Sequence, residues 1–143
     1  MKQLFLFISI LTPLLLLTSY SKKNKDYVTI IDYVDKTKRS DGGYSVSNDS
    51  LFIFFEEKFK HDTIELTVGR ERRRLFLTTD FALGLANSQI FGNIQNISEF
   101  KLSINGRKEH KIKINNKLMN KWSVNFYRDT LKITVLKYVP FYD

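Results

Sequence analysis

The chain has 143 residues, the size of a single domain, and a formal net charge of +8 from 23 Lys and Arg against 15 Asp and Glu. It contains no Cys, which excludes disulfides, thiol nucleophiles and thiolate metal sites. We therefore expect a domain held together by its hydrophobic core, to which 12 Phe, 7 Tyr and 1 Trp contribute.

The first 21 residues have the three parts of a secretory signal peptide. Lys2 supplies a positive charge, residues 4–17 form an apolar run, and residues 18–21 are small or polar. The apolar run is shorter than the roughly 20 residues that a helix needs to cross a hydrocarbon layer. We therefore expect a signal peptide at 1–21, a solvated tether at 22–26 and one exported domain at 27–143. Without the leader, 22 Lys and Arg face 15 Asp and Glu, a net charge of +7.

The end of this leader resembles a bacterial lipoprotein signal. Residues 17–19, Leu-Thr-Ser, match the start of the lipobox, and the Ser- and Lys-containing residues 21–26 match the tether that often follows. Tyr20 stands where that family has the lipidated Cys, and a phenol cannot form the thioether. The resemblance implies a bacterial envelope location, in the periplasm, at the cell surface or secreted. A lipoprotein signal that has lost its Cys and an ordinary signal peptide cut after Ser21 are both open, and an uncleaved anchor is a third option.

The first half of the domain alternates β-branched and aromatic segments with turns, which is typical of short strands. We expect strands at 27–35, 51–55, 64–68 and 73–79, with a turn-rich loop at 36–48. Placing Val68 opposite Arg73 would pair Leu66 with Leu75 and Ile64 with Leu77, which puts the apolar side chains on one face.

Two further hairpins follow in the second half. Around Asn105-Gly106 we expect a three-residue loop with a bulge, because a two-residue loop would place apolar residues opposite charged ones. The expected pairs are Ser103 with Arg107, Lys101 with Glu109, and Glu99 with Lys111. In the last hairpin the expected pairs are Phe126 with Leu131, Val124 with Ile133, and Trp122 with Val135.

The fold class predicted from these elements is all-β. Residues 80–96 contain Gly84 and Asn87, which weaken a helix, so we expect an irregular or short helical crossover there. Seven or eight strands with one crossover indicate a single antiparallel β-sandwich, for which an immunoglobulin-like arrangement is one form and a small barrel the alternative. Phe141 and Tyr142 are expected to pack at one end of the sheets.

Catalytic patterns are absent from the sequence. His61 is expected in an exposed turn, and His110 is expected to be a structural residue at a sheet edge. Glu56 and Glu57 are neighbours in an extended segment, so they point to opposite faces and cannot act on one substrate atom. We expect no catalytic residue, no metal site and no cofactor.

Two basic clusters are the strongest candidates for a binding site. They are Arg70, Arg72, Arg73 and Arg74 at one turn, and Lys101, Arg107, Lys111 and Lys113 in the Asn-Gly hairpin. Arg and Lys suit phosphate, sulfate and carboxylate groups, although charged residues also keep a sheet face hydrated and protect sheet edges. If the four arginines bind a partner, replacing them with Ser should weaken binding without lowering the melting temperature.

The sequence therefore predicts an exported, non-catalytic binding or envelope-associated accessory module. The expected partner is a protein, an anionic glycan or another envelope component, with no specific recognition of nucleic acid. A protein inhibitor or immunity-type factor is the first alternative. A hydrolase is the second.

Overall fold

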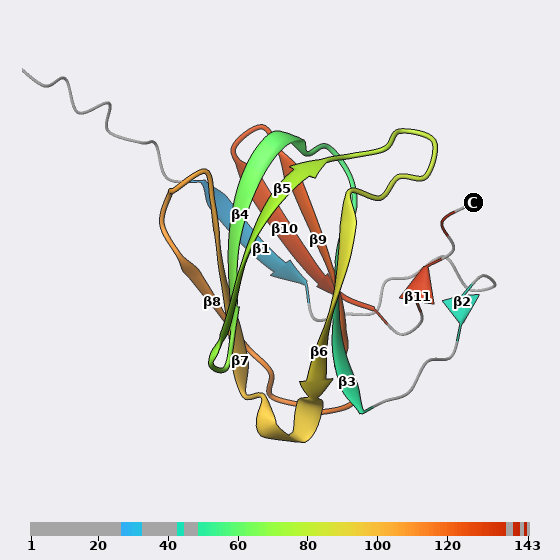
Figure 1. Ribbon diagram of the computed structural model, residues 1–143, viewed down its shortest axis with the longest axis vertical. Helices are drawn as coiled ribbons and strands as arrows, with labels where there is room; N and C mark the ends of the chain where they lie inside the picture. Colours follow the sequence, from blue (N-terminus) through green and yellow to red (C-terminus); the bar gives the residue numbers. More distant parts are fainter. Residues whose placement is uncertain (1–26, 33–42, 45–48, 137–138, 141, 143) are drawn as a thin grey trace, which may run out of the picture.

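A computed structural model describes residues 27–32, 43–44, 49–136, 139–140 and 142. The expected signal peptide and tether lie outside these residues, as does Phe141. The regular secondary structure of these residues is almost entirely β-strand (Figure 1). The strands are β1 (Val28–Asp32), β2 (Gly43–Tyr44), β3 (Ser50–Phe55), β4 (Lys60–Val68), β5 (Glu71–Thr78), β6 (Asn87–Asn93), β7 (Glu99–Ile104), β8 (His110–Lys113), β9 (Lys121–Tyr127), β10 (Thr130–Val135) and β11 (Val139–Pro140), and a 3-10 helix, η1 (Ile94–Asn96), follows β6. Nowhere in the described ranges is there a helix long and apolar enough to cross a membrane.

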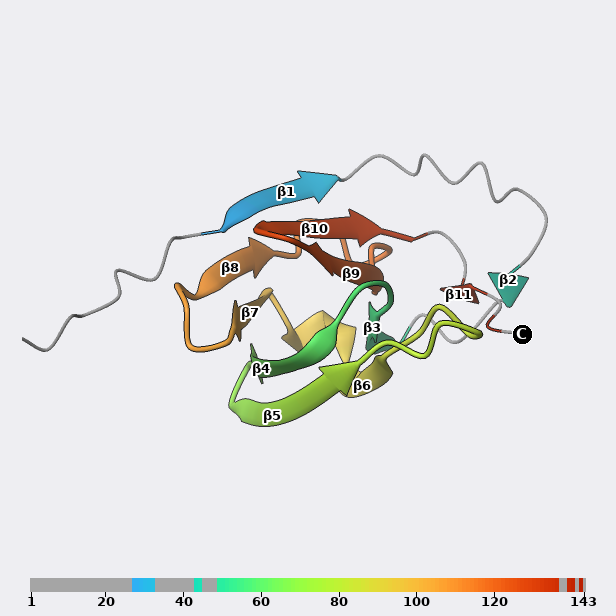
Figure 2. The ribbon, with the colours of Figure 1, turned by 90° about the horizontal axis from the view of Figure 1, so that it is seen from above.

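The strands form two main sheets and one small one. The five-stranded sheet has the order β1-β10-β9-β3-β6, and the four-stranded sheet has the order β5-β4-β7-β8. Figure 2 shows β1 and β10 on one side of the molecule and β4 and β5 on the other. The short strands β2 and β11 pair with each other, so part of the expected loop at 36–48 is a strand.

Both main sheets contribute to one hydrophobic core. Every second residue of β4, from Asp62 to Val68, is buried, because alternate side chains of a strand point to the same face. Trp122 on β9 and Phe100 on β7 are fully buried, and their rings meet edge to face at a centroid distance of 5.4 Å. The expected aromatic contribution to the core is therefore confirmed.

The last hairpin was predicted correctly. Phe126 pairs with Leu131, Val124 with Ile133, and Trp122 with Val135. Each of these six side chains is buried, since alternation and an even loop place all of them on the core face.

The expectation of a purely antiparallel fold is wrong for the five-stranded sheet. There β1 runs parallel to β10, and β3 runs parallel to β9. Alternation of apolar residues identifies a strand and its buried face, but it does not identify the neighbouring strand. The chain between β3 and β9 builds the whole four-stranded sheet before it returns beside β3, and a parallel pair requires such a long crossover.

The segment 80–96 contains the expected short helix, η1, but it also contains the strand β6, which was not expected. This edge strand buries only Phe91 and leaves Ile90 exposed, so its apolar pattern is weak. Asp80 caps a turn at the start of this segment: its Oδ1 accepts hydrogen bonds from the backbone N–H of Ala82 at 2.8 Å and of Leu83 at 3.3 Å.

The β4–β5 hairpin differs from the expected pairing by two residues. Val68 lies opposite Glu71, and the turn consists of Gly69 and Arg70 alone. Gly69 has a φ of +58°, which glycine adopts without the steric cost that a Cβ brings. Because the shift is even, Leu75 and Leu77 still face the core side of the sheet.

The pairing of β7 with β8 also differs by two residues, with Lys101 opposite Lys111 and Glu99 opposite Lys113. Asn105 and Gly106 form a turn in which both have positive φ, but residues 107–109 then leave the ladder and pairing resumes at His110. The predicted charge pairs nevertheless form as diagonal contacts. Lys101 Nζ lies 3.8 Å from Glu109 Oε1, and Lys111 Nζ lies 2.7 Å from Glu99 Oε2.

Candidate anion-binding face

The outer face of the four-stranded sheet carries five of the eight predicted binding residues. We call this surface the basic face; its cations are Arg72 and Arg74 on β5, Lys101 on β7, and Lys111 and Lys113 on β8. The residues that alternate with them, such as Phe100, Leu102 and Ile112, are fully buried in the core. The cations therefore point away from the core, to the solvent side of the sheet.

One row of side chains on the basic face crosses all four strands. Arg72 lies opposite Thr67, Thr67 opposite Lys101, and Lys101 opposite Lys111. Because neighbouring strands are about 4.8 Å apart, the row spans about 14 Å between its outermost Cα atoms. Two regions that are separate in the sequence thus contribute to one continuous surface.

Carboxylates contact several of these cations. Arg72 Nη2 lies 2.6 Å from Glu65 Oε2, and Lys111 pairs with Glu99 as described above. The hydrogen bond from Lys111, together with the charges of Lys111, Lys101 and Lys113, lowers the pKa of Glu99 below its ordinary value. The five cations contact or neighbour three carboxylates, those of Glu65, Glu99 and Glu109, so the face keeps an excess of positive charge.

The other three predicted residues lie elsewhere. Arg70 is exposed in the β4–β5 turn, and Arg107 Nη1 contacts Asp129 Oδ1 at 2.9 Å. Arg73 points to the opposite side of β5 from Arg72, where its Nη1 donates to Gln89 Oε1 at 2.5 Å. The structure therefore does not bring the four arginines together, because adjacent residues of a strand face opposite ways.

The two histidines both contact threonine hydroxyls. His61 lies at a bulge within β4 rather than in a turn; it is exposed, and its Nδ1 is 3.1 Å from Thr78 Oγ1. His110 lies on the edge strand β8, as expected, with its Nδ1 2.8 Å from Thr29 Oγ1. Across the ranges that the structure describes, no group of three or more His, Asp and Glu side chains is placed to hold a metal ion.

Glu56 belongs to a polar network on the outer side of the five-stranded sheet. It accepts hydrogen bonds from the Ser123 hydroxyl, from Asn125 Nδ2 at 3.2 Å and from the Tyr142 hydroxyl at 2.9 Å. The ring of Tyr142 lies 6.0 Å from that of Phe54, so Tyr142 does pack, but against the outer side of the five-stranded sheet. The hydrogen bond to Glu56 and the ring contact with Phe54 hold Tyr142 against the sheet.

Sequence reasoning missed the polar residues that complete the basic face, which are Glu65, Thr67 and Ser103. The alternation within β4 and β7 places them on the solvent side, but their position between the two basic clusters depends on the pairing of β4 with β7. That pairing joins residues about 35 positions apart, and no local pattern records it. Comparison of the chain with protein-family models, curated proteins and solved structures finds no match.

Proposed function

We propose that this chain is an exported, non-catalytic binding module of the bacterial envelope, and that its basic face binds an anionic polymer such as an acidic glycan. The observation that carries the proposal is the row across all four strands in which Arg72, Lys101 and Lys111 line up with Thr67. A row of this length can contact several successive anionic groups of one extended chain. The protein-inhibitor, immunity-factor and hydrolase alternatives would use loops at one end of the sheets.

We propose further that the two main sheets form a β-sandwich. Support comes from the single core that both sheets share. The two sheets are also hydrogen-bonded separately, whereas the strands of a closed barrel form one continuous sheet. The parallel pairing of β3 with β9 separates this arrangement from an immunoglobulin domain, whose two sheets are antiparallel. A sandwich leaves the outer face of each sheet available to a ligand.

The basic face suits weak, multiple contacts rather than one deep site. Its cations are exposed or half-exposed, and charges in water more than about 8 Å apart are largely screened at physiological ionic strength. Binding should therefore depend on several cations acting together on one ligand. It should also weaken as salt is added.

Binding of the full chain to dextran sulfate, compared with neutral dextran of the same length, tests the proposal. We expect binding to the sulfated polymer only, and about tenfold weaker binding when Lys101 and Lys111 are both replaced by Gln. The matched control replaces Lys108 and Lys132, which are exposed and lie outside the row, and changes the net charge equally. Equal losses in the two double variants would show that only net charge matters and would overturn the proposal.

A further inference from the structure

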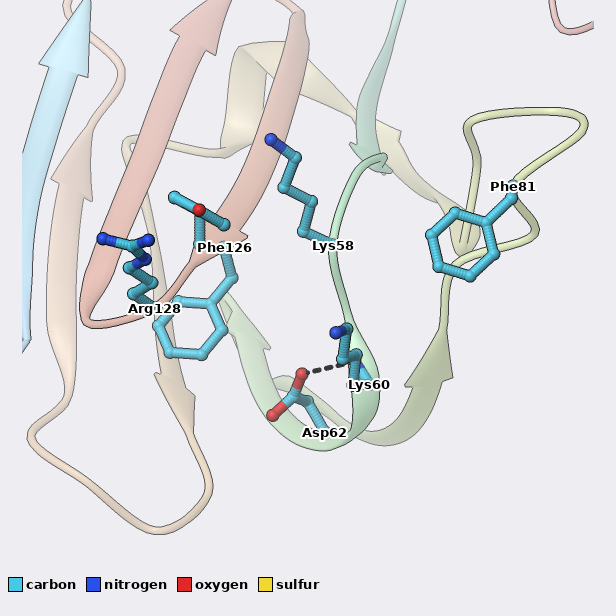
Figure 3. A pocket seen from close by; sticks show the side chains of 7 residues that line it. Lys58, Lys60, Asp62, Phe81, Phe126 and Arg128 are labelled. Carbon is cyan, nitrogen blue, oxygen red and sulfur yellow. Dashed lines mark hydrogen bonds between the residues drawn. The ribbon is translucent and has the colours of Figure 1, made fainter.

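A cavity of about 480 Å³ lies where the start of β4, the loop after β5 and the β9–β10 hairpin meet, and none of its lining residues is a cation of the basic face (Figure 3). We call it the aromatic cavity. Three rings line it, those of Phe81, Phe126 and Tyr127, together with three cations, Lys58, Lys60 and Arg128. In Figure 3 Phe81 and Arg128 lie on opposite sides, with Lys58 between them. Small-molecule sites usually occupy about 300–1,000 Å³, so the volume fits a small ligand rather than a polymer.

Two of the three cations of the aromatic cavity lie over one ring. Lys58 Nζ lies 4.4 Å from the centroid of the Tyr127 ring, and Arg128 Cζ lies 5.0 Å from it. Among the described residues no carboxylate lies within 4.0 Å of the charged groups of Lys58, Lys60 or Arg128. These three groups are therefore available to an anion from solution.

Asp62 is the one acidic residue of the lining, and its carboxylate holds the backbone in place. Oδ2 accepts a hydrogen bond from the Lys60 N–H at 2.8 Å, and Oδ1 accepts one from Asn105 Nδ2 at 2.7 Å. The side chain is nearly buried. Its oxygens thus support the wall of the cavity and leave the lysine ammonium groups without a carboxylate partner.

The loop that carries the lysines is fixed from inside. Phe59, between Lys58 and Lys60, is buried, and its N–H donates to Thr79 Oγ1 at 2.9 Å. Thr79 N–H donates in turn to the Phe59 carbonyl at 3.0 Å. Phe59 thus anchors this segment in the core, while Lys58 and Lys60 on either side of it are exposed.

The backbone around the aromatic cavity is strained. Lys58 has a φ of +73° and Arg128 a φ of +56°, and His61, between two lining residues, has a φ of +54°. Such a conformation costs a residue other than glycine about 1–3 kcal/mol, and it occurs preferentially at functional sites. Gly at positions 58 and 128 would adopt these φ values without that cost, so the strain belongs to the two cationic residues themselves.

The rings at the mouth are unusually exposed. Phe81 is 83% exposed and Tyr127 50% exposed, whereas Phe126 behind them is buried. A ligand with an apolar body would cover Phe81 and Tyr127 and remove that surface from water. The cavity therefore combines an apolar wall with unpaired positive charge.

We propose that the aromatic cavity binds a small organic anion, in which a carboxylate, sulfonate or phosphate contacts Lys58, Lys60 and Arg128 while an aromatic or aliphatic body lies against Phe81 and Tyr127. This site is separate from the basic face, and it does not depend on polymer binding there. The ligand class follows from the lining itself, because neither a neutral apolar molecule nor inorganic phosphate would use both kinds of contact.

The probe for this proposal is 8-anilinonaphthalene-1-sulfonate, with its uncharged analogue N-phenyl-1-naphthylamine as the matched ligand. Both are titrated by fluorescence into the full chain. We expect the sulfonate to bind more tightly than the neutral analogue. Replacing Lys58 and Arg128 by Met should weaken sulfonate binding about tenfold, the loss expected for charge-assisted contacts, and leave the neutral analogue unchanged.

Two further variants complete the test. Phe81→Ser should weaken binding of both probes, because it removes the apolar wall. The Lys101→Gln/Lys111→Gln variant of the basic face should leave both probes unchanged, which separates this proposal from the polymer-binding one. Equal affinity for the two probes, or equal loss in the cavity and basic-face variants, would overturn the proposal. Residues 1–21 are the same in every variant, so any probe fluorescence that they cause is the same in each titration.

Discussion

The guanidinium carbon of Arg73 lies 4.1 Å from the centroid of the Phe91 ring. Arg73 belongs to β5, the edge of the four-stranded sheet, and Phe91 belongs to β6, the edge of the five-stranded sheet. The same guanidinium donates to the Ile90 carbonyl at 3.2 Å as well as to Gln89. One arginine of the predicted binding cluster thus joins the two sheets along one side of the core.

Arg73→Ser should therefore destabilise the fold, contrary to the expectation that all four arginines could be replaced without loss of stability. We expect the free energy of unfolding to fall by about 1–3 kcal/mol, since hydrogen bonds and a ring contact are lost together. Arg72→Ser is the matched control, because Arg72 is exposed on the outer face and should change stability by less than about 0.5 kcal/mol. Urea denaturation measures the free energy of unfolding of both variants. Equal losses would contradict the conclusion that Arg73 joins the two sheets.

Thr29 and His110 join the sheets along the opposite side. Thr29 lies on β1 and His110 on β8, and the His110 ring also packs 4.5 Å from that of Tyr27. Thr29→Val keeps a strand-compatible shape but removes the hydroxyl, so we expect a loss of about 1 kcal/mol. Val28→Thr, at an exposed neighbouring position, should be nearly neutral. A similar loss in both variants would argue against the contact.

The sequence predicted strands and their buried faces well, and pairing less well. In the last hairpin a short loop limits the possible pairs, so Trp122 and Val135 could be matched correctly. In the β7–β8 hairpin the prediction assigned the correct side chains to the core face. The pairs are nevertheless shifted by two, because residues 107–109 leave the ladder. The face on which a side chain lies follows from its chemistry, whereas the exact pairing of two strands depends on the geometry of the loop between them.

The candidate sites show the same limit over longer distances. The basic clusters were visible because their members are close in sequence, but only the β4–β7 pairing places Lys101 beside Thr67, in one row with Arg72. The aromatic cavity could not be recognised, because Lys58, Phe81 and Arg128 come from three loops. Each is an ordinary loop residue until the fold brings the three loops together.

Glu99 offers a direct test of the charge arrangement on the basic face. The hydrogen bond from Lys111 is the largest cause of its lowered pKa, so Lys111→Gln should raise the pKa of Glu99 more than Lys113→Gln does. NMR titration of the Glu99 carboxyl measures this. A lowered pKa in the folded state means that Glu99 stabilises the fold above its ordinary pKa and loses that contribution as the pH falls through the lowered value. The stability difference between the wild type and Lys111→Gln should therefore narrow in acid.

Lys121 presents the opposite case, a cation on the outer side of β9 that is only 5% exposed. Burial lowers its pKa from the ordinary 10.5, although Nζ donates to Asn120 Oδ1 at 2.9 Å. A lysine whose pKa is lowered by folding opposes folding fully below the lowered value, and this cost disappears as the pH rises past 10.5. The wild type should therefore gain stability relative to Lys121→Met as the pH is raised from 7 toward that value. Melting temperatures across this range give the measurement, with Lys132→Met, on an exposed residue of the same sheet, as the control. If the difference in melting temperature between wild type and Lys121→Met does not change with pH, the neighbours of the buried ammonium fully compensate its desolvation.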